Sequence, residues 1–197
     1  RPFYLEGEEL QFIQTQDSIT NYHSSEEYLQ EQDSIYNSLT VWDFLFNGIG
    51  FRNTFKKQSF WFSSLINGVD PFGVGGFRYN VDFEYEKEFK NGHAIEVRPF
   101  LDYGHNNRDL KGTLGLGYLY DPLRFSKVSF RIGDTYDFVN SYQSIQGTLS
   151  PANRVRNRVI EINHEFEIIN GLYLRTGIEA SLRQALTNIV YPDWVDR

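Results

Sequence analysis

The most regular feature of the sequence is an alternation of apolar and polar residues that starts near residue 58 and continues almost to the end. Side chains two positions apart lie on the same face of a β-strand, so this period predicts strands with one apolar and one polar face. The clearest example is the segment 75–89. Its charged and amide residues alternate with the apolar residues Phe77, Tyr79, Val81, Phe83, Tyr85 and Phe89. Similar segments bring the expected total to about seven strands, the others being 59–67, 93–104, 110–120, 128–138, 158–168 and 172–183.

The connections between these strands alternate in length. Asn91-Gly92 and Asn170-Gly171 predict tight type I′ hairpins, since asparagine and glycine accept the positive φ angles of that turn. The connection at 121–126 is also short, and the longer ones are 68–74, 105–109 and 140–157. Alternate turns of an antiparallel meander lie at opposite ends, so the tight turns share one end. Short turns at one end and long loops at the other are typical of an outer-membrane β-barrel.

Strand length and aromatic content favour a membrane barrel. Several segments supply the roughly 9 to 11 residues that a membrane-spanning strand needs, whereas strands of soluble sheets usually have about 5 or 6. Aromatic residues make up 17% of the chain, and several tyrosines lie on the apolar side near strand ends, where an amphipathic ring suits a membrane interface. The polar side then faces a wet lumen, for which the charged candidates are Arg78, Asp82, Glu84, Arg98, Asp102, Arg131, Glu165, Arg175, Glu179 and Arg183.

Two residues break the alternation. Asp134 falls on the apolar side, where a carboxylate in lipid is unfavourable, and a β-bulge at Gly133 would shift it to the other face. His164 also falls on the apolar side, between Ile162 and Phe166. We expect a neutral imidazole there, packed against a neighbouring strand or helix.

Residues 1–57 differ from the rest in being rich in Gln, Glu, Asp and Ser. The spacing of apolar residues from Tyr28 to Leu45 fits a helical period, and Asn47-Gly48 is a suitable helix stop. We therefore expect a polar linker that ends in a short amphipathic helix, followed by a partial transmembrane barrel over 58–197. The helix either docks on its own domain or meets lipid or the barrel wall through aromatic residues such as Trp42.

Composition narrows the classes of function. The chain of 197 residues has a formal net charge of −7 and scattered basic residues, which argues against nucleic-acid binding. It has no cysteine and no apolar run long enough for a transmembrane helix. Nucleophile, phosphate-binding, zinc and calcium motifs are absent from the sequence, and its four histidines have no ligand-like spacing. We therefore expect a protein that is not an enzyme and needs no metal or cofactor.

A series of short motifs runs through most of the chain. They are Asp-Ser-Ile at 33–35, the segment 42–50, Lys-Lys-Gln-Ser-Phe at 56–60, Gly-Phe at 76–77, Pro-Phe-Leu-Asp-Tyr-Gly at 99–104, Asn-Gly-Leu at 170–172 and the segment 183–188. Their order and spacing resemble Bacteroidetes outer-membrane proteins that join a carboxypeptidase-regulatory-like domain to a β-barrel region of unknown function. The tetrapeptide at 74–77 has glycine where that family commonly has glutamate, and Ala185 replaces a frequent proline. Both departures preserve the strand pattern.

This resemblance implies a location in the bacterial outer membrane with the N-terminal side in the periplasm, and it carries over no catalytic residue. The chain is then a fragment of a barrel, with more of the barrel beyond it, acting as a channel or transporter-like element or in envelope assembly. Its expected partners are outer-membrane lipid and other envelope proteins. The alternative is a soluble all-β binding module in which the apolar strand faces form the core.

Overall fold

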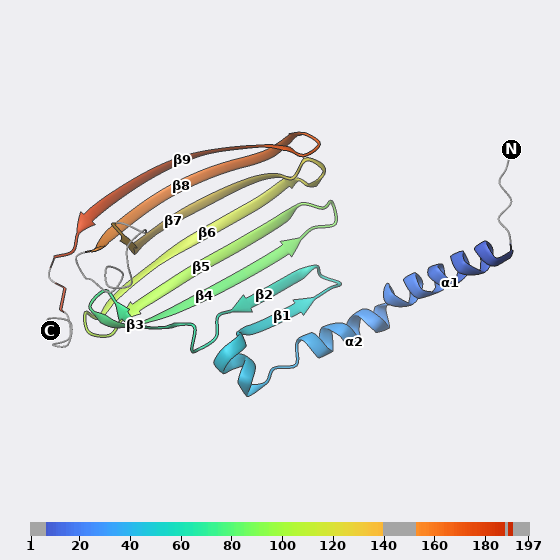
Figure 1. Cartoon of the computed structure of the whole chain (residues 1–197), viewed down its shortest axis with the longest axis horizontal. Helices are drawn as coiled ribbons and strands as arrows, with labels where there is room; N and C mark the ends of the chain where they lie inside the picture. Colours follow the sequence, from blue (N-terminus) through green and yellow to red (C-terminus); the bar gives the residue numbers. More distant parts are fainter. Residues whose placement is uncertain (1–6, 140–152, 188, 191–197) are drawn as a thin grey trace.

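The structure is a computed structural model that describes residues 7–139, 153–187 and 189–190. Two helices and a π-helical turn lead into one antiparallel sheet of nine strands (Figure 1). The helices are α1 (Gly7–His23) and α2 (Glu26–Tyr36), and the π-helical turn spans Asp43–Asn47. The strands are β1 (Ile49–Asn53), β2 (Gln58–Phe62), β3 (Val69–Gly73), β4 (Gly76–Glu88), β5 (Ala94–Gly104), β6 (Asp109–Asp121), β7 (Ser126–Phe138), β8 (Arg154–Ile169) and β9 (Leu172–Ala185).

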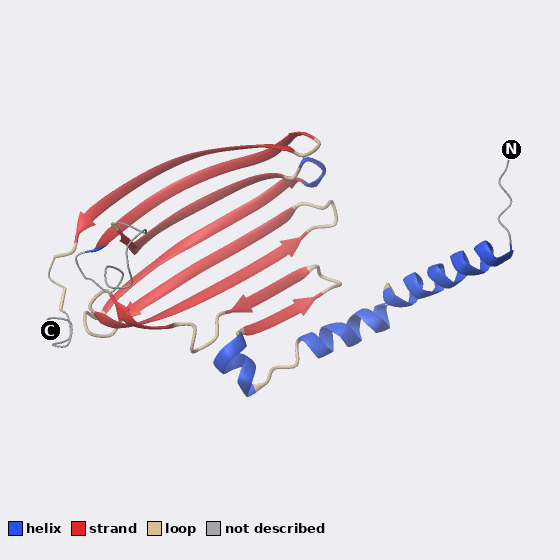
Figure 2. Ribbon diagram, viewed as in Figure 1, coloured by secondary structure: helices blue, strands red, loops and turns tan. Residues whose placement is uncertain are grey.

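The sheet is an up-and-down meander in which each long strand pairs with the next along the chain, in the order β1-β2-β4-β5-β6-β7-β8-β9. Strands account for most of the described residues that follow the helices (Figure 2). The all-β class predicted from the alternation is therefore correct. The described part of the sheet is open, with β1 and β9 as its edges.

The expected number of strands was too low, because the structure adds two short ones. β1 lies inside the segment assigned to the linker, and its five residues are too few to display an alternation around Gly50. β3 shares an edge of β4 with β2, so the two form one strand interrupted between residues 62 and 69. β8 also begins earlier than expected, at Arg154. The rest of the expected long loop, 140–152, lies outside the described residues.

The Asn-Gly turns form at the expected places but with a different geometry. Gly92 and Gly171 have φ angles of 80° and 83°, whereas neither Asn91 nor Asn170 has a positive φ. In the first turn the N–H of Gly92 donates to the carbonyl of Phe89, and the N–H of Phe89 donates to the carbonyl of His93. This is a type I turn followed by a left-handed glycine, so the type I′ prediction was wrong. One left-handed residue per turn is enough to reverse the chain.

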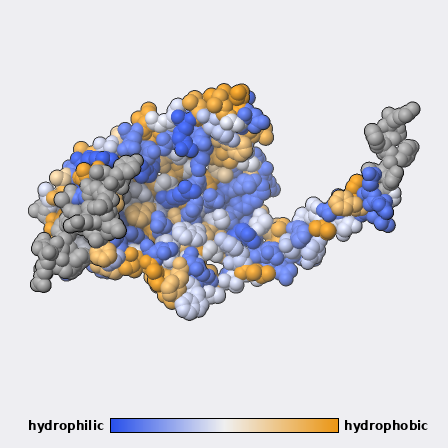
Figure 3. All heavy atoms as spheres, in the orientation of Figure 1, coloured by the Kyte–Doolittle hydropathy of each residue, from blue (hydrophilic) through white to orange (hydrophobic). Residues whose placement is uncertain are grey.

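The registers separate an apolar from a polar face across the whole sheet. One row of paired residues on the apolar face crosses eight strands and consists of Phe51, Phe60, Tyr85, Val97, Leu116, Phe130, Ile162 and Ile178. Among the described residues, only Val74 and Val159 are buried apolar side chains. Hydrophilic side chains gather over the middle of the sheet in the view of Figure 3, and hydrophobic ones lie at its margins. The described sheet thus has no second layer over its apolar face.

Asp134 is the charged residue that interrupts the series of apolar residues Val128, Phe130 and Ile132 on β7. The β6–β7 and β7–β8 ladders run through Gly133 without a shift in register, so the predicted bulge was wrong. A Cβ at Gly133 would lie 2.4 Å from Thr113 Cγ2, so this glycine permits a close approach of β6. Asp134 accepts hydrogen bonds from Lys111 at 3.2 Å and from Arg156 Nε at 2.8 Å. The carboxylate thus meets Arg156 and also Lys111, which pairs with Asp102 on the polar side of the sheet, without any shift in register.

His164 packs as expected against side chains of the sheet. Its Nε2 lies 2.6 Å from the hydroxyl oxygen of Tyr120, and its ring stacks on both Tyr120 and Phe166. Tyr120 belongs to β6, so the contact passes over Val128 of the intervening strand. The histidine is part of an aromatic cluster near the tight-turn end of the sheet.

The N-terminal segment is more helical than predicted, with α1, α2 and the π-helical turn in place of one short helix. Ser25 caps α2 by accepting a hydrogen bond from the backbone N–H of Tyr28. Neither described helix is long and apolar enough to cross a membrane. Both helices extend away from the sheet at the end that carries the tight turns (Figure 1).

Asp33 fastens the end of α2 to β1. Its carboxylate accepts hydrogen bonds from Arg52 Nε at 2.9 Å and from the Thr54 backbone N–H at 2.6 Å and hydroxyl at 2.7 Å. The side chain of Asn37 pairs with both the N–H and the carbonyl of Arg52. Burial alone raises the pKa of Asp33, but the hydrogen bonds from Thr54 and Arg52 outweigh it and hold the pKa below its usual value of 3.8.

Asp33→Asn is expected to release α2, because the amide replaces a carboxylate that accepts three hydrogen bonds. Hydrogen exchange should show lower protection over residues 26–36, and Asp17→Asn on the exposed helix α1 should leave it unchanged. The lowered pKa means that ionised Asp33 contributes fully above a pH of about 3.8, and that this contribution is lost as the pH falls through the lowered pKa. Equal protection of α2 in the variant and the native chain would contradict this anchoring role.

Candidate functional site

The registers bring all ten charged residues expected in the lumen to one face of the sheet. Pairings such as Asp102 with Lys111, Arg131 with Glu161 and Glu165 with Arg175 connect their positions across the strands. This face, called the polar face below, also carries charged residues that the sequence analysis did not select, among them Glu96, Asp109, Lys111, Lys127 and Glu161. They lie at the same parity as the expected ones, so the alternation already contained the information needed to find them.

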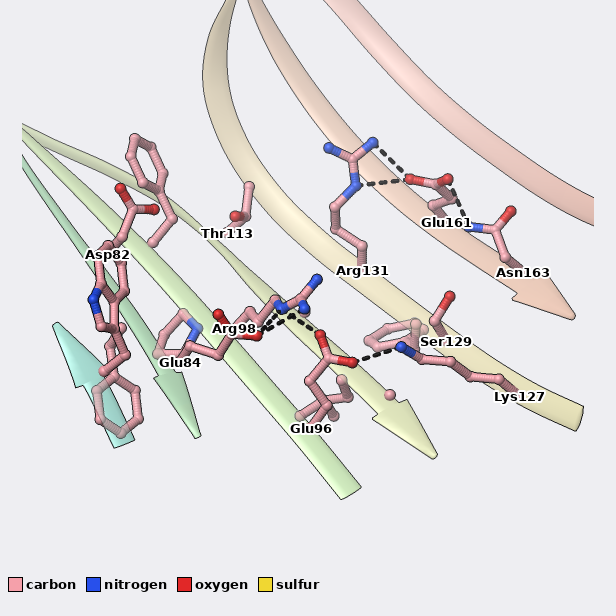
Figure 4. Close-up of a pocket in the computed structure, with 18 residues that line it drawn as sticks. Asp82, Glu84, Glu96, Arg98, Thr113, Lys127, Ser129, Arg131, Glu161 and Asn163 are labelled. Atoms are coloured by element: carbon pink, nitrogen blue, oxygen red, sulfur yellow. Dashed lines mark hydrogen bonds and ion pairs between the residues drawn. The ribbon is translucent and has the colours of Figure 1, made fainter. Parts of the chain in front are cut away.

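Ion pairs cover the centre of the polar face (Figure 4). Arg98 contacts Glu84 at 2.7 Å and also pairs with Glu96. Lys127 reaches the other oxygen of Glu96 at 2.5 Å. The bases and acids here therefore neutralise each other across β4, β5 and β7.

A second ion pair lies further along the sheet. Arg131 of β7 contacts Glu161 of β8 at 2.6 Å, and Glu161 also accepts a hydrogen bond from Asn163 at 2.7 Å. In Figure 4 this group lies apart from the group around Arg98. The two guanidinium groups stand on either side of β6, which has no charged side chain between them.

Two glycines on β6 create the space between these groups. A Cβ at Gly117 would lie 2.9 Å from Lys127 Cε and 3.2 Å from Glu96 Oε2, so this glycine lets the Lys127–Glu96 pair pass over β6. Gly115 pairs with Arg98 on one side and Arg131 on the other, and the nearest atom to an added Cβ is 3.4 Å away. Gly115 therefore leaves an open floor.

Above this floor lies an open hollow of about 600 Å³. Besides the ion pairs it is lined by two aromatic residues on the polar face, Trp61 of β2 and Phe100 of β5. The sequence analysis did not select either residue, because it considered only charged residues as candidates on the polar side of the strands. Asp82, which pairs with Phe100 in the β4–β5 ladder, also lines the hollow.

A separate cluster lies at the opposite end of the sheet from the tight turns, around Arg78. This side chain is 2% exposed. Its Nε donates to Asp102 at 2.8 Å, and its Nη1 donates to Asp109 at 2.9 Å and to the carbonyl of Val74 at 3.1 Å. The Tyr136 hydroxyl donates to Asp109 at 2.8 Å, and the Arg78 guanidinium lies 4.9 Å from the centre of the Tyr136 ring. Sequence reasoning selected Arg78 and Asp102 but not their partners Asp109 and Tyr136.

The remaining expected residues lie away from both clusters. Glu165 and Arg175 form an exposed ion pair between β8 and β9. Glu179 and Arg183 have no ion-pair partner within the part of the chain that the structure describes. The same part contains no group of three or more His, Cys, Asp or Glu residues able to hold a metal ion. The chemistry of the polar face is thus one of hydrogen bonding and charge pairing.

Taken together, these features define an antiparallel meander of long strands with one apolar face and one charge-paired face. A model of the C-terminal domain of DUF5686, a family of unknown function, matches residues 42–197, and the chain belongs to this family. No curated protein and no solved structure matches the chain. The matched region begins at the π-helical turn, so it includes β1 together with the rest of the sheet.

Removal of Arg78 is expected to lower the free energy of unfolding strongly. Arg78→Ala leaves two buried or half-buried carboxylates without their cation, which costs about 3–5 kcal/mol. Arg175→Ala, which breaks a pair whose arginine is 74% exposed, should cost only about 0–1 kcal/mol. Urea unfolding of the refolded protein, followed by tryptophan fluorescence, measures both. Similar losses of unfolding free energy in the two variants would show that the buried ion pairs of Arg78 stabilise the protein no more than an exposed pair does.

Proposed function

We propose that this chain forms part of a bacterial outer-membrane β-barrel whose polar face lines a water-filled lumen. The observation that carries the proposal is the uncovered apolar face, where residues such as Leu116, Ile162 and Ile178 are 41%, 50% and 77% exposed. Exposed apolar surface on this scale is unfavourable in water and favourable against lipid. Acyl chains would cover this face, and the charged face would remain hydrated.

The dimensions of the strands support the same proposal. Strands β4 to β9 contain between 11 and 16 residues, which is enough to span the hydrocarbon region at the tilt usual for barrels. Aromatic residues lie near both ends of the apolar face, including Phe77 and Tyr103 at one end and Tyr118 and Tyr120 at the other. Such girdles suit the two membrane interfaces.

The turns suggest an orientation. The tight turns and the helices α1 and α2 share one end of the sheet, and short turns face the periplasm in barrels of this class. The N-terminal side would then be periplasmic, as the resemblance to Bacteroidetes proteins with a carboxypeptidase-regulatory-like domain implies. Outer-membrane lipid is the proposed partner of the apolar face, with other envelope proteins as further partners.

The activity we propose is non-enzymatic, with a channel or transport-like role for polar solutes or a role in envelope assembly. Paired charges on the polar face keep the lumen hydrated while adding little net field. The alternative, a soluble binding module, requires a second layer over the apolar face. The described residues supply no such layer, which favours the barrel.

Membrane fractionation of the intact protein, followed by electrophoresis with and without boiling, tests the barrel. The expected result is recovery in the outer-membrane fraction and a lower mobility after boiling, because closed barrels stay compact in detergent until they are heated. Recovery in the soluble fraction without a mobility shift would favour the binding module and make the apolar face a core.

A charge on the apolar face tests which side meets lipid. Val81→Arg should destabilise the protein folded into lipid vesicles by roughly 2–4 kcal/mol, the cost of an arginine near the bilayer midplane. Asp82→Asn, on the neighbouring residue of β4, should change the free energy of unfolding little, because its side chain faces the lumen. Urea titration in vesicles measures both variants, and equal effects would refute the assignment of the faces.

A further inference from the structure

We propose that the hollow on the polar face binds a neutral saccharide, stacked on Trp61 and Phe100 and hydrogen-bonded by the groups between them. This inference rests on the proposed barrel, because it takes the polar face to be the lumen. It deepens that proposal by naming the class of solute.

Two aromatic residues give the polar face surfaces on which a ligand can stack. Trp61 and Phe100 point to the same side as the charged residues of β4 and β5, away from the apolar face. Trp61 is 38% exposed and has part of its indole against the backbone near Gly48. Flat apolar rings in a wet, polar setting suit a ligand that has apolar C–H faces and hydroxyl edges. A sugar ring has both.

The hydrogen-bonding groups near these rings are available. Within the described part of the chain, the side chains of Asp82, Thr113 and Ser129 line the hollow without a side-chain hydrogen bond of their own. Asp82 and Thr113 both lie beside Phe100 in the ladders. A free carboxylate and two free hydroxyls offer the acceptors and donors that sugar hydroxyls need.

The charges of the hollow argue against an ionic ligand. Its lining contains the bases Arg98, Lys127 and Arg131 and the acids Asp82, Glu84, Glu96 and Glu161. Every base is already paired with an acid, so only the carboxylate of Asp82 is left over. An anion would meet no free cation, and a polycation would meet a single free charge. A neutral ligand rich in hydroxyl groups has the best match.

Substitutions in the floor and wall of the hollow test whether the saccharide binds there. Gly115 has ordinary contact distances around an added Cβ, so Gly115→Val fills the hollow without a backbone clash and keeps a residue suited to strands. Trp61→Ala removes the larger stacking surface. Trp42→Ala is the matched control, because Trp42 lies at the start of the π-helical turn, is 66% exposed and does not line the hollow.

The experiment is calorimetric titration of the intact protein in detergent micelles with maltohexaose, mannohexaose and hexa-N-acetylchitohexaose, and with spermine and tetraglutamate as charged probes. We expect saturable binding of at least one neutral hexasaccharide. Trp61→Ala and Gly115→Val should each weaken that binding by about tenfold or more, as is usual for a central aromatic contact. Trp42→Ala should leave the affinity unchanged.

The inference would be overturned by the absence of binding of all three saccharides, or by saccharide binding that both hollow variants retain. Tighter binding of spermine or tetraglutamate than of the saccharides would also overturn it. The mobility shift on boiling is measured on the same samples. A chain that shows the shift but binds no saccharide refutes only the solute class, whereas a chain without the shift refutes the barrel itself.

Discussion

The enclosure of Arg78 constrains the whole end of the sheet opposite the tight turns. A buried guanidinium is tolerated only when its donors are satisfied and its charge is balanced, and here the partners come from β5, β6 and the turn before β4. Two glycines make room for it. A Cβ at Gly73 would lie 2.6 Å from Arg78 Cδ, and a Cβ at Gly104 would lie 2.3 Å from Arg78 Nη1. One side chain therefore fixes the approach of several strands.

Charge pairing continues this principle along the polar face. Arg98, Lys127 and Arg131 each meet a carboxylate of another strand, so the sheet is connected by side chains as well as by its backbone ladders. Pairs that are half exposed contribute little individually to stability. Their main effect is to hold charged side chains flat against the strands and keep the hollow open above Gly115. Ion pairing therefore has two effects in this sheet. The buried pairs of Arg78 stabilise one end, and the more exposed pairs in the middle determine the shape of the hollow.

The N-terminal segment protects the edge of the sheet in a different way. An edge strand exposes unpaired backbone groups that invite other strands to pair with it. On β1, the side chain of Asn37 occupies both backbone groups of Arg52. The Tyr36 ring also lies 4.6 Å from the Arg52 guanidinium. The end of α2 therefore covers part of this edge and links the helices to the sheet.

The sequence alone determined the strand character of the chain, the two faces and the common face of the ten charged residues, because a period of two is a local property of a strand. It located the turns at Gly92 and Gly171 but assigned the wrong turn type, since the φ angle of each asparagine depends on how the flanking strands pair. β1 and β3 were missed because short strands carry too few alternations and are stabilised by their neighbours. Only the tertiary structure decided that Asp134 is neutralised by Lys111 and Arg156, that Gly133 serves close packing, and that Trp61, Phe100 and Gly115 shape one hollow. Those relations join residues far apart in the chain, and strand register, which the sequence does not encode locally, brings them together.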